Sequence, residues 1–287
     1  MMVRDIFFGE GSKRVLCLVD SFHGARNVVE RVKCHDNKWE DVLFFRTRHE
    51  AIRYAAEASC DFLFTDSDVG VKIFLSLAWF KIYNRKTRIC VYEEGLGTYR
   101  DDIYSPLKAW LFNVFGVGAQ FGACGLTDDI YIFDKETYVK KAPLSCHKAR
   151  IITAQLEEYV GRSSCLADIF NVSTALHGLL DSSRDGLCLV YLGSWSVSDS
   201  ALFEIRQVTA GVKILKLHPH ITSEAGVEFY NSFDYVVDPS LPAELLLLTV
   251  AERFDRVIVY HHGSSIVRYF KSSGVDFIDL GWNVVCK

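Results

Sequence analysis

The chain has 287 residues, of which 49% are hydrophobic, and this is enough apolar material for one large or two medium domains. We expect two domains. The 32 basic and 36 acidic side chains leave a formal net charge of −4, so the overall charge gives no electrostatic reason to expect binding to DNA or RNA.

The first half alternates short apolar runs, typical of strands, with longer amphipathic runs, typical of helices. Strands separated by helices favour a parallel sheet with helices on its faces. We predict strands at residues 14–19, 42–45, 62–64, 89–92 and 129–133, and helices at 25–32, 49–58, 71–83 and 106–114.

The second half repeats this scheme and predicts a second unit of the same kind. Between the halves the sequence is more polar and ends in a turn cluster at 181–186. We therefore predict an α/β chain with an N-terminal domain at 1–153, a linker region at 154–186 and a C-terminal domain at 187–287. In the second domain we expect strands at 187–192, 212–217, 235–237, 256–260 and 276–280, and helices at 199–209, 243–252 and 265–270.

The nine cysteines are scattered singly without a CxxC pair, which indicates reduced thiols and a cytoplasmic protein. Charged residues around a very short apolar stretch at the N-terminus do not fit a secretory signal. Residues 109–126 carry no formal charge, but four glycines, Asn113 and Gln120 make them a poor spanning helix. We expect an internal helix and loop here, with contact at the inner membrane surface as the alternative.

An acidic pair follows the predicted strand at 89–92, in the sequence Glu93-Glu94-Gly95. Parallel α/β sheets bind ligands beyond the carboxyl ends of their strands, so the pair stands where catalysis is expected. Neighbouring carboxylates repel, which raises the pKa of one of them and lets it accept a proton from a sugar hydroxyl. The alternative is a solvated acidic turn.

Several segments of the second half stand at equivalent places. In Lys216-Leu217-His218-Pro219, an imidazole follows a strand and the proline stops that strand. Ser264 and Ser265 open a helix, where hydroxyls and free N–H groups suit an anion. The alternatives are a loop histidine and a plain helix cap. Two further candidates are Glu244, in a first helical turn, and the pair Gly193 and Ser194, which follows the first strand of this half.

Two patterns resemble metal-binding sites, but we do not interpret them as such. Asp66-Ser67-Asp68 resembles the DxD sequence of metal-dependent glycosyltransferases, but a polar loop at a strand end is the preferred interpretation. His218, His220, His261 and His262 lack the cysteine or HExxH spacing of a zinc site. We therefore expect no metal.

The acidic, His-Pro and paired-serine sequences, with Pro242-Ala243-Glu244-Leu245 between the last two, resemble in order and spacing the motifs of bacterial sialyltransferases. This resemblance spans about residues 90–265 and implies the GT-B fold, which has two Rossmann-like parallel-sheet domains with a cleft between them. The implied reaction is inverting transfer of sialic acid from CMP-sialic acid without an essential metal or other cofactor. The N-terminal domain would bind the acceptor and the C-terminal domain the CMP-sugar.

The resemblance also implies a role for each matching residue. Glu94 would be the general base with Glu93 supporting it, and His218 would bind and protonate the departing CMP phosphate. The donor would be bound by Gly193, Ser194, Lys216, Pro219, Glu244, Ser264 and Ser265. The acidic pair is Glu-Glu where many relatives use Asp, which leaves the donor sugar open between sialic acid and Kdo or another nonulosonic acid.

The expected partners follow from this role. They are the CMP-sugar donor and a glycan or lipid-linked acceptor of a capsule, lipooligosaccharide or O-antigen, and the expected site of action is the cytoplasmic face of the inner membrane. A metal-dependent transferase using Asp66 and Asp68 is a less favoured alternative. A non-catalytic subunit that binds sugar nucleotides as a scaffold is the alternative outside the enzymes.

Overall fold

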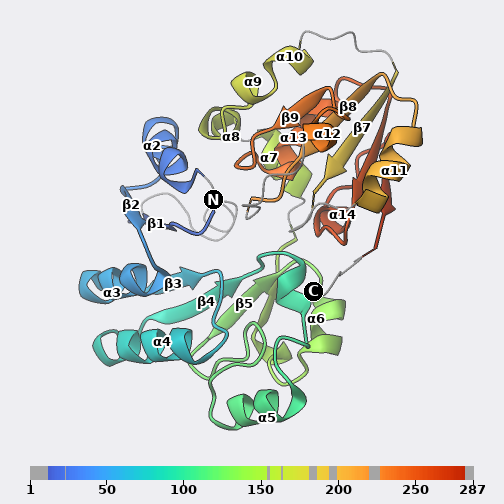
Figure 1. Ribbon diagram of the computed structural model, residues 1–287. Helices are drawn as coiled ribbons and strands as arrows, with labels where there is room; N and C mark the ends of the chain where they lie inside the picture. Colours follow the sequence, from blue (N-terminus) through green and yellow to red (C-terminus); the bar gives the residue numbers. More distant parts are fainter. Residues whose placement is uncertain are drawn as a thin grey trace. The chain divides into compact units, whose positions relative to one another are not determined.

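The computed structural model describes residues 12–22, 24–153, 156–162, 164–180, 186–193, 199–219 and 227–281. The chain divides into two compact units (Figure 1). The described part of the first unit comprises Ser12, Cys17–Val19 and the residues from Phe45 to Thr153. The second contains Lys13–Leu16, the described part of Asp20–Phe44, and the described residues that follow Gln155.

The first unit is built on a four-stranded parallel sheet in the order β3-β4-β5-β6. The central strands are buried because their residues are almost all apolar, as in Ile89, Val91, Ile130 and Ile132. The strands are β3 (Phe62–Thr65), β4 (Arg88–Tyr92), β5 (Asp129–Ile132) and β6 (Ala149–Ile151). The helices are α3 (Arg48–Ala58), α4 (Val71–Tyr83), α5 (Pro106–Val114) and α6 (Lys135–Lys141), with short 3-10 turns η1 (Leu96–Tyr99) and η2 (Cys146–Lys148).

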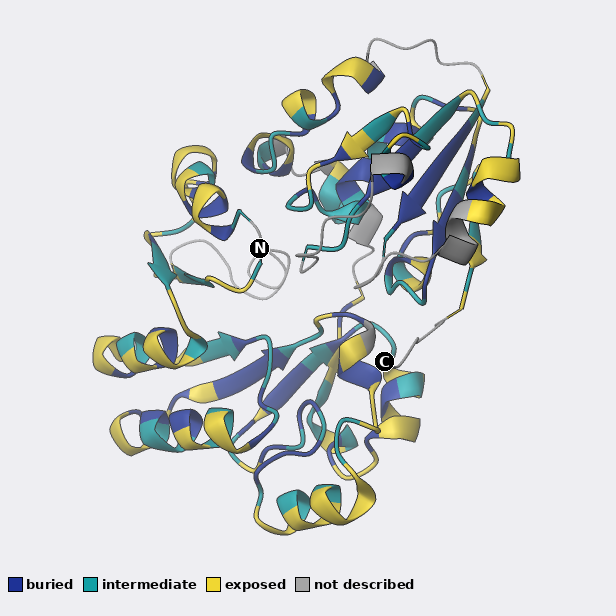
Figure 2. Cartoon of the chain, viewed as in Figure 1, coloured by how far each residue is buried: buried dark blue, intermediate teal, exposed yellow. Residues whose placement is uncertain are grey.

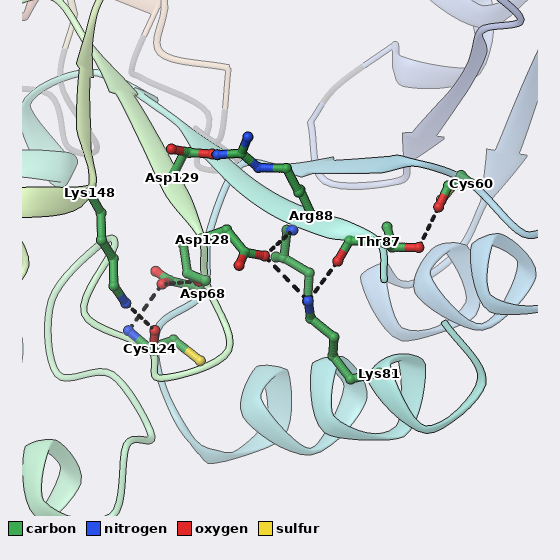
Figure 3. A network of polar contacts seen from close by, with 11 residues as sticks. Cys60, Asp68, Lys81, Thr87, Arg88, Cys124, Asp128, Asp129 and Lys148 are labelled. Carbon is green, nitrogen blue, oxygen red and sulfur yellow. Dashed lines mark hydrogen bonds and ion pairs between the residues drawn. The ribbon is translucent and has the colours of Figure 1, made fainter. Parts of the chain in front are cut away.

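Charged groups join the strands of this sheet at the amino ends of β4 and β5 (Figure 3). The buried carboxylate of Asp129 accepts from Arg88 of β4 and, at 2.7 Å, from Arg150 of β6. Lys81 of α4 donates to the Thr87 carbonyl at 2.6 Å and pairs with Asp128 at 3.3 Å. These contacts stabilise the edge of the sheet opposite to the carboxyl ends of the strands.

The second unit has a five-stranded parallel sheet in the order β11-β10-β7-β8-β9. Its core gathers aromatic and aliphatic side chains around Tyr191, including Phe229 and Phe233. The strands are β7 (Leu187–Leu192), β8 (Val212–Lys216), β9 (Tyr235–Val237), β10 (Arg256–His261) and β11 (Val275–Asp279). Helices α11 (Asp199–Gln207), α12 (Val227–Tyr230), α13 (Ala243–Ala251) and α14 (Ile266–Tyr269) connect them.

The strand order of this sheet reverses direction once. From β7 the chain proceeds through β8 to β9 on one side, and then returns to β10 and β11 on the other. The switch point therefore lies between the carboxyl ends of β7 and β10, where loops leave in opposite directions and open α/β sheets bind their ligands. The predicted α/β class, with Rossmann-like parallel sheets in two units, is confirmed.

The unit boundaries differ from the sequence-based ones. In its described part, the predicted linker at 154–186 has four short helices, α7 (Leu156–Arg162), α8 (Ser164–Ile169), α9 (Val172–Ala175) and α10 (His177–Leu180). Ile169, Leu176 and Leu179 of these helices are buried. Helix α2 (Ala25–His35) packs on α8 and belongs to the second unit. Strands β1 (Val15–Val19) and β2 (Asp41–Phe45) form a separate two-stranded sheet.

The uncharged stretch at 109–126 divides into two parts. Val117, Ala119, Phe121 and Cys124 are buried, so the expectation of an internal loop is confirmed there. Helix α5 has no buried residue, so the expectation of an internal helix is wrong for this part. None of the helices in the described ranges combines the length and apolarity that crossing a bilayer requires.

Candidate active site

The acidic pair follows β4 at the carboxyl edge of the first sheet, and Glu93 is the fixed member. Its Oε2 accepts from the Phe133 N–H at 2.7 Å and from the Tyr99 hydroxyl. The same hydroxyl accepts from the Asp134 N–H at 3.0 Å, and burial together with the Glu93 carboxylate raises the pKa of Tyr99. Glu93 thus ties the end of β4 to the end of β5, and its role is to position the loop.

Glu94 is the exposed member of the pair. Its N–H donates to the buried Thr98 hydroxyl at 3.0 Å, and Gly95 follows with φ 117, a conformation that side chains disfavour. The pKa of Glu94 is raised by desolvation and by the charge of Asp66, while Arg48 opposes the rise. A raised pKa suits a carboxylate that must accept a proton.

Two more elements contribute charged groups to this edge. Arg48 opens α3 and forms an ion pair with Asp66, which directly follows β3. Burial lowers the pKa of Arg48, but the hydrogen bond to Asp66 and the charges of Asp66 and Glu94 outweigh this effect, so the net shift is upward. The pKa of Tyr92 is raised by burial and by the same two carboxylates. Arg48, Asp66, Tyr92 and Glu94 therefore form one electrostatic cluster, called the acidic cluster below.

The acidic cluster was only partly visible in the sequence. Thr65 pairs with Val91 in the parallel register, so Asp66 and Tyr92 continue neighbouring strands side by side. The place of Asp66 after a strand was the available signal, but the preferred interpretation was a polar loop, with a metal site formed by Asp66 and Asp68 as the alternative. Arg48 carried no signal, because nothing in the sequence brings the start of α3 to β4.

Asp68, the second carboxylate of the DxD-like sequence, is fully buried and accepts hydrogen bonds from the loop before β5 (Figure 3). It accepts from the N–H groups of Gly122 at 2.9 Å and Cys124 at 3.2 Å, and from the Thr127 hydroxyl at 2.7 Å. Burial raises its pKa, while these donors and Lys148 oppose the rise. Asp66-Ser67-Asp68 directly follows β3, and it divides between the acidic cluster, which includes Asp66, and the buried contacts of Asp68.

In the second unit, the loops after β7 and β8 touch. The Gly193 N–H donates to the Lys216 carbonyl at 2.8 Å. A Cβ at Gly193 would lie 3.4 Å from that oxygen and 3.6 Å from the Leu217 Cα, which are ordinary van der Waals distances, so the two backbone segments are close neighbours. His218 and Pro219 are half-buried just beyond this contact. Ser194, the other residue predicted here, lies outside the described residues.

Lys216 and Glu244 place opposite charges beside this contact. Lys216 is 6% exposed and donates to the carbonyls of Leu217 at 2.9 Å and Pro239 at 3.2 Å. Burial lowers its pKa to about 8, against the charges of Glu244 and Asp238. Burial also raises the pKa of Glu244, which stands in the first turn of α13, although Lys216 opposes the rise. Both groups are therefore held in an environment that disfavours charge.

A backbone network holds the paired-serine loop after β10. The Ser264 N–H donates to His261 Nδ1 at 3.2 Å, and the Gly263 N–H donates to Asp279 Oδ1 at 3.1 Å. Burial lowers the pKa of His261, which keeps it neutral and able to accept. Ser265 caps α14 without a side-chain bond. The predicted helix at 265–270 is only the single turn Ile266–Tyr269, so a helix dipole contributes less here than expected.

His262 connects the two strands that flank the switch point. Its Nδ1 donates to the Gly281 carbonyl at 2.8 Å, which leaves Nε2 to accept from the Tyr191 hydroxyl at 2.9 Å. Both ring nitrogens are thus occupied. Among the described residues, no group of three or more His, Cys, Asp or Glu side chains could hold a metal ion.

The structure therefore gathers most predicted residues at two places. Glu93 and Glu94 lie at the carboxyl edge of the first sheet. The other predicted residues that the structure describes lie around the carboxyl edge of the second sheet. Lys216 ends β8, Glu244 is in the first turn of α13, and Gly193, His218, Pro219, Ser264 and Ser265 are in the segments that follow β7, β8 and β10.

No protein-family model matches the sequence, and a comparison with curated proteins finds no match. Similar solved structures include the wall teichoic acid polymerase TagF, at 11% identity and TM-score 0.48, covering 88% of this chain and 67% of that one. A TagF structure soaked with CDPG gives 12% identity, TM-score 0.49 and coverages of 88% and 66%. UDP-GlcNAc 2-epimerase from Methanocaldococcus jannaschii gives 10% identity, TM-score 0.47 and coverages of 93% and 89%. The matched part of this chain spans about two thirds of the TagF chain.

Proposed function

We propose that this protein is an inverting GT-B glycosyltransferase that transfers sialic acid from CMP-sialic acid to a hydroxyl of a bacterial surface glycan. The observation that carries the proposal is the acidic cluster, which presents an exposed carboxylate of raised pKa at the carboxyl edge of a parallel sheet. The order of the acidic, His-Pro and paired-serine motifs supports the same reaction.

In the proposed reaction Glu94 is the general base. The acceptor oxygen bonds to the anomeric carbon of the sugar while the bond from that carbon to the CMP phosphate oxygen breaks, and the hydroxyl proton moves to Glu94. Attack from the face opposite CMP inverts the anomeric configuration. Glu93 acts by positioning, since its carboxylate is already bonded to Phe133 and Tyr99.

The second unit would hold the donor. Its switch point between β7 and β10 is the expected place for a nucleotide, with Gly193 after β7 and Ser264 and Ser265 after β10. Ser194 keeps the donor-binding role that its place in the sequence suggests. His218 would protonate the departing phosphate and Glu244 would bind the ribose. Lys216 and Pro219 would flank that histidine.

No essential metal is part of the proposal, since Asp68 uses both carboxylate oxygens to hold its own loop. This observation opposes the alternative of a DxD-type metal-dependent transferase. A Kdo or other nonulosonic-acid transferase would use the same groups with another CMP-sugar. A non-catalytic scaffold would bind CMP but would not need the acidic cluster.

The first experiment is a donor screen by mass spectrometry with CMP-sialic acid, CMP-Kdo and common UDP- and GDP-sugars, in the presence of EDTA. We expect CMP release from CMP-sialic acid alone. CMP release from CMP-Kdo alone would identify CMP-Kdo as the donor and would leave the proposed type of reaction unchanged. CMP binding without turnover on a range of glycan acceptors would favour the scaffold.

The base is tested with Glu94→Gln, which should lower kcat by about 10²- to 10⁴-fold with CMP affinity unchanged. The matched control is Glu57→Gln on α3, an exposed glutamate whose i,i+4 partner is Arg53, and it should leave kcat unchanged. The acid limb of the pH profile should shift down in Asp66→Asn and up in Arg48→Met, because these changes remove the charges that raise and lower the Glu94 pKa. Full turnover in Glu94→Gln would overturn the base assignment.

A further inference from the structure

Helix α5 carries an apolar stripe that faces away from the protein. Its residues recur at i, i+3, i+4 and i+7, the spacing that normally covers a core. In this helix they are exposed, and so is the phenylalanine that follows: Leu107 by 71%, Trp110 by 60%, Leu111 by 39%, Val114 by 60% and Phe115 by 71%. The outer face of α5 is accordingly coloured as exposed in Figure 2.

The opposite face of α5 packs against the rest of the first unit. Ala109, Phe112 and Asn113 are partly covered. The Phe112 ring meets Tyr104 edge-on at 4.9 Å, and the Lys108 ammonium lies 4.4 Å from the centre of the Tyr104 ring. The helix is thus seated through its other side, and the apolar stripe is left without a partner in the described part of the chain. Contiguous exposed apolar surface of this kind marks an interaction site.

Helix α4 of the same unit carries a second exposed apolar surface. Val71, Leu75, Ile82 and Tyr83 are exposed along it. The segments that precede the two helices lie close together, because a Cβ at Gly70, just before α4, would lie 2.8 Å from the hydroxyl of Tyr104, just before α5. Two apolar helix faces therefore belong to neighbouring elements of the same unit.

The formal charges within α4, α5 and the residues that directly follow these helices are of one sign. Residues 71–86 contain no acidic residue, and residues 106–127 contain Lys108 as their single formal charge. The exposed basic residues of these stretches are Lys72, Arg85, Lys86 and Lys108. The whole chain has a net charge of −4, so this local excess of cations is specific to the surface. It complements an anionic partner.

We propose that α5, together with the exposed face of α4, docks on the surface of a lipid bilayer that contains anionic lipids. Leucine, tryptophan and phenylalanine enter the boundary between headgroups and acyl chains, and lysine and arginine reach the phosphates. The attachment is peripheral, because the described helices are too short to span a bilayer. The inference does not depend on the glycosyltransferase proposal, since the test below uses neither donor nor acceptor.

The test is cosedimentation of the full chain with vesicles. We expect binding to phosphatidylcholine vesicles that contain phosphatidylglycerol, weaker binding to phosphatidylcholine alone, and further weakening at high salt. The double variant Leu107→Ser, Trp110→Ser should lower the partition coefficient by at least about tenfold. The matched control is Leu144→Ser, at a leucine of the same unit that is 72% exposed but lies outside both helices, and it should bind like the wild type.

Each other outcome would overturn the proposal. A folded wild-type protein that binds neither vesicle excludes docking, and so does a folded double variant that binds as well as the wild type. Circular dichroism establishes that each variant is folded. If light scattering shows that the double variant dissociates an oligomer while vesicle binding is unchanged, the surface joins copies of this chain and the lipid assignment fails.

Discussion

Lys216 is a buried cation whose protonation should control nucleotide binding. Its pKa is lowered to about 8 because burial disfavours the charge. Between pH 8 and the ordinary pKa of 10.5, the Lys216 side chain is mostly protonated in the unfolded chain but mostly neutral in the folded one. The burial of Lys216 therefore lowers the stability of the fold by its full amount below pH 8, and by less as the pH rises through that window. A phosphate beside the ammonium would stabilise the charged form and offset this cost.

We therefore predict that CMP affinity, measured by calorimetry, is highest below pH 8 and falls as the pH rises above it. Lys216→Met should weaken binding at pH 7 by about tenfold and remove the decline, because the charge-assisted bond is lost at every pH. Lys213→Met, at the other end of β8, is the control and should keep the pH profile of the wild type. An identical decline in Lys216→Met would show that another group is responsible.

The loop from Gly116 to Thr127 depends on one carboxylate, that of Asp68. Because the loop has no regular secondary structure, its N–H groups need a partner, and Asp68 accepts from two of them and from Thr127. Removal of the Asp68 carboxylate leaves three buried donors without their acceptor. We therefore predict that Asp68→Ala destabilises the protein by about 3 kcal/mol, which would be measured as a lower midpoint of urea unfolding. Asp102→Ala, an exposed residue paired with Arg100, should change stability by under about 0.5 kcal/mol. Equal midpoints for the two variants would contradict this role.

Elements were predictable from the sequence where one periodic pattern was strong. The 71–83 and 106–114 helices and the 187–192 strand have the predicted bounds, because their apolar spacing and flanking breakers agree. Which way α5 faces was not predictable, since the same i, i+3, i+4 stripe covers a core in most helices and is exposed here. Helix α6 and strand β6 were missed, because Lys135–Lys141 is mainly polar and Ala149–Ile151 has only three residues.

The candidate site was predictable only as separate positions at strand ends. Glu94 and Lys216 were found because each stands at the end of a recognisable strand. The charges that shift the Glu94 pKa come from Asp66 and Arg48, which are 28 and 46 residues away in the sequence (94 − 66 and 94 − 48). Such a tertiary neighbourhood depends on strand order and helix docking, and neither is encoded locally.

The division of the whole chain depends on contacts between distant segments. Helix α2 comes early in the sequence but packs on α8 of the second unit, with Val28, Val29 and Val32 buried. Arg31 donates to the Ile169 carbonyl at 3.4 Å, and a Cβ at Gly24 would lie 3.3 Å from the Ser240 Cβ. No local pattern reveals such a pairing, because α2 is an ordinary amphipathic helix whose partner follows more than a hundred residues later.

This arrangement predicts how the second unit behaves when it is cut out. A fragment of residues 155–287 lacks α2 and exposes the apolar surface of α8 that α2 covers, so it should be less stable than the same unit in the full chain and prone to aggregate. Supplying residues 13–44 by coexpression should increase the yield of soluble fragment and restore cooperative thermal unfolding. Supplying the same segment with Val29→Asp should not, because a carboxylate would then be buried without a partner. A fragment of 155–287 that unfolds cooperatively at the same temperature with and without residues 13–44 would show that α2 contributes nothing to this unit.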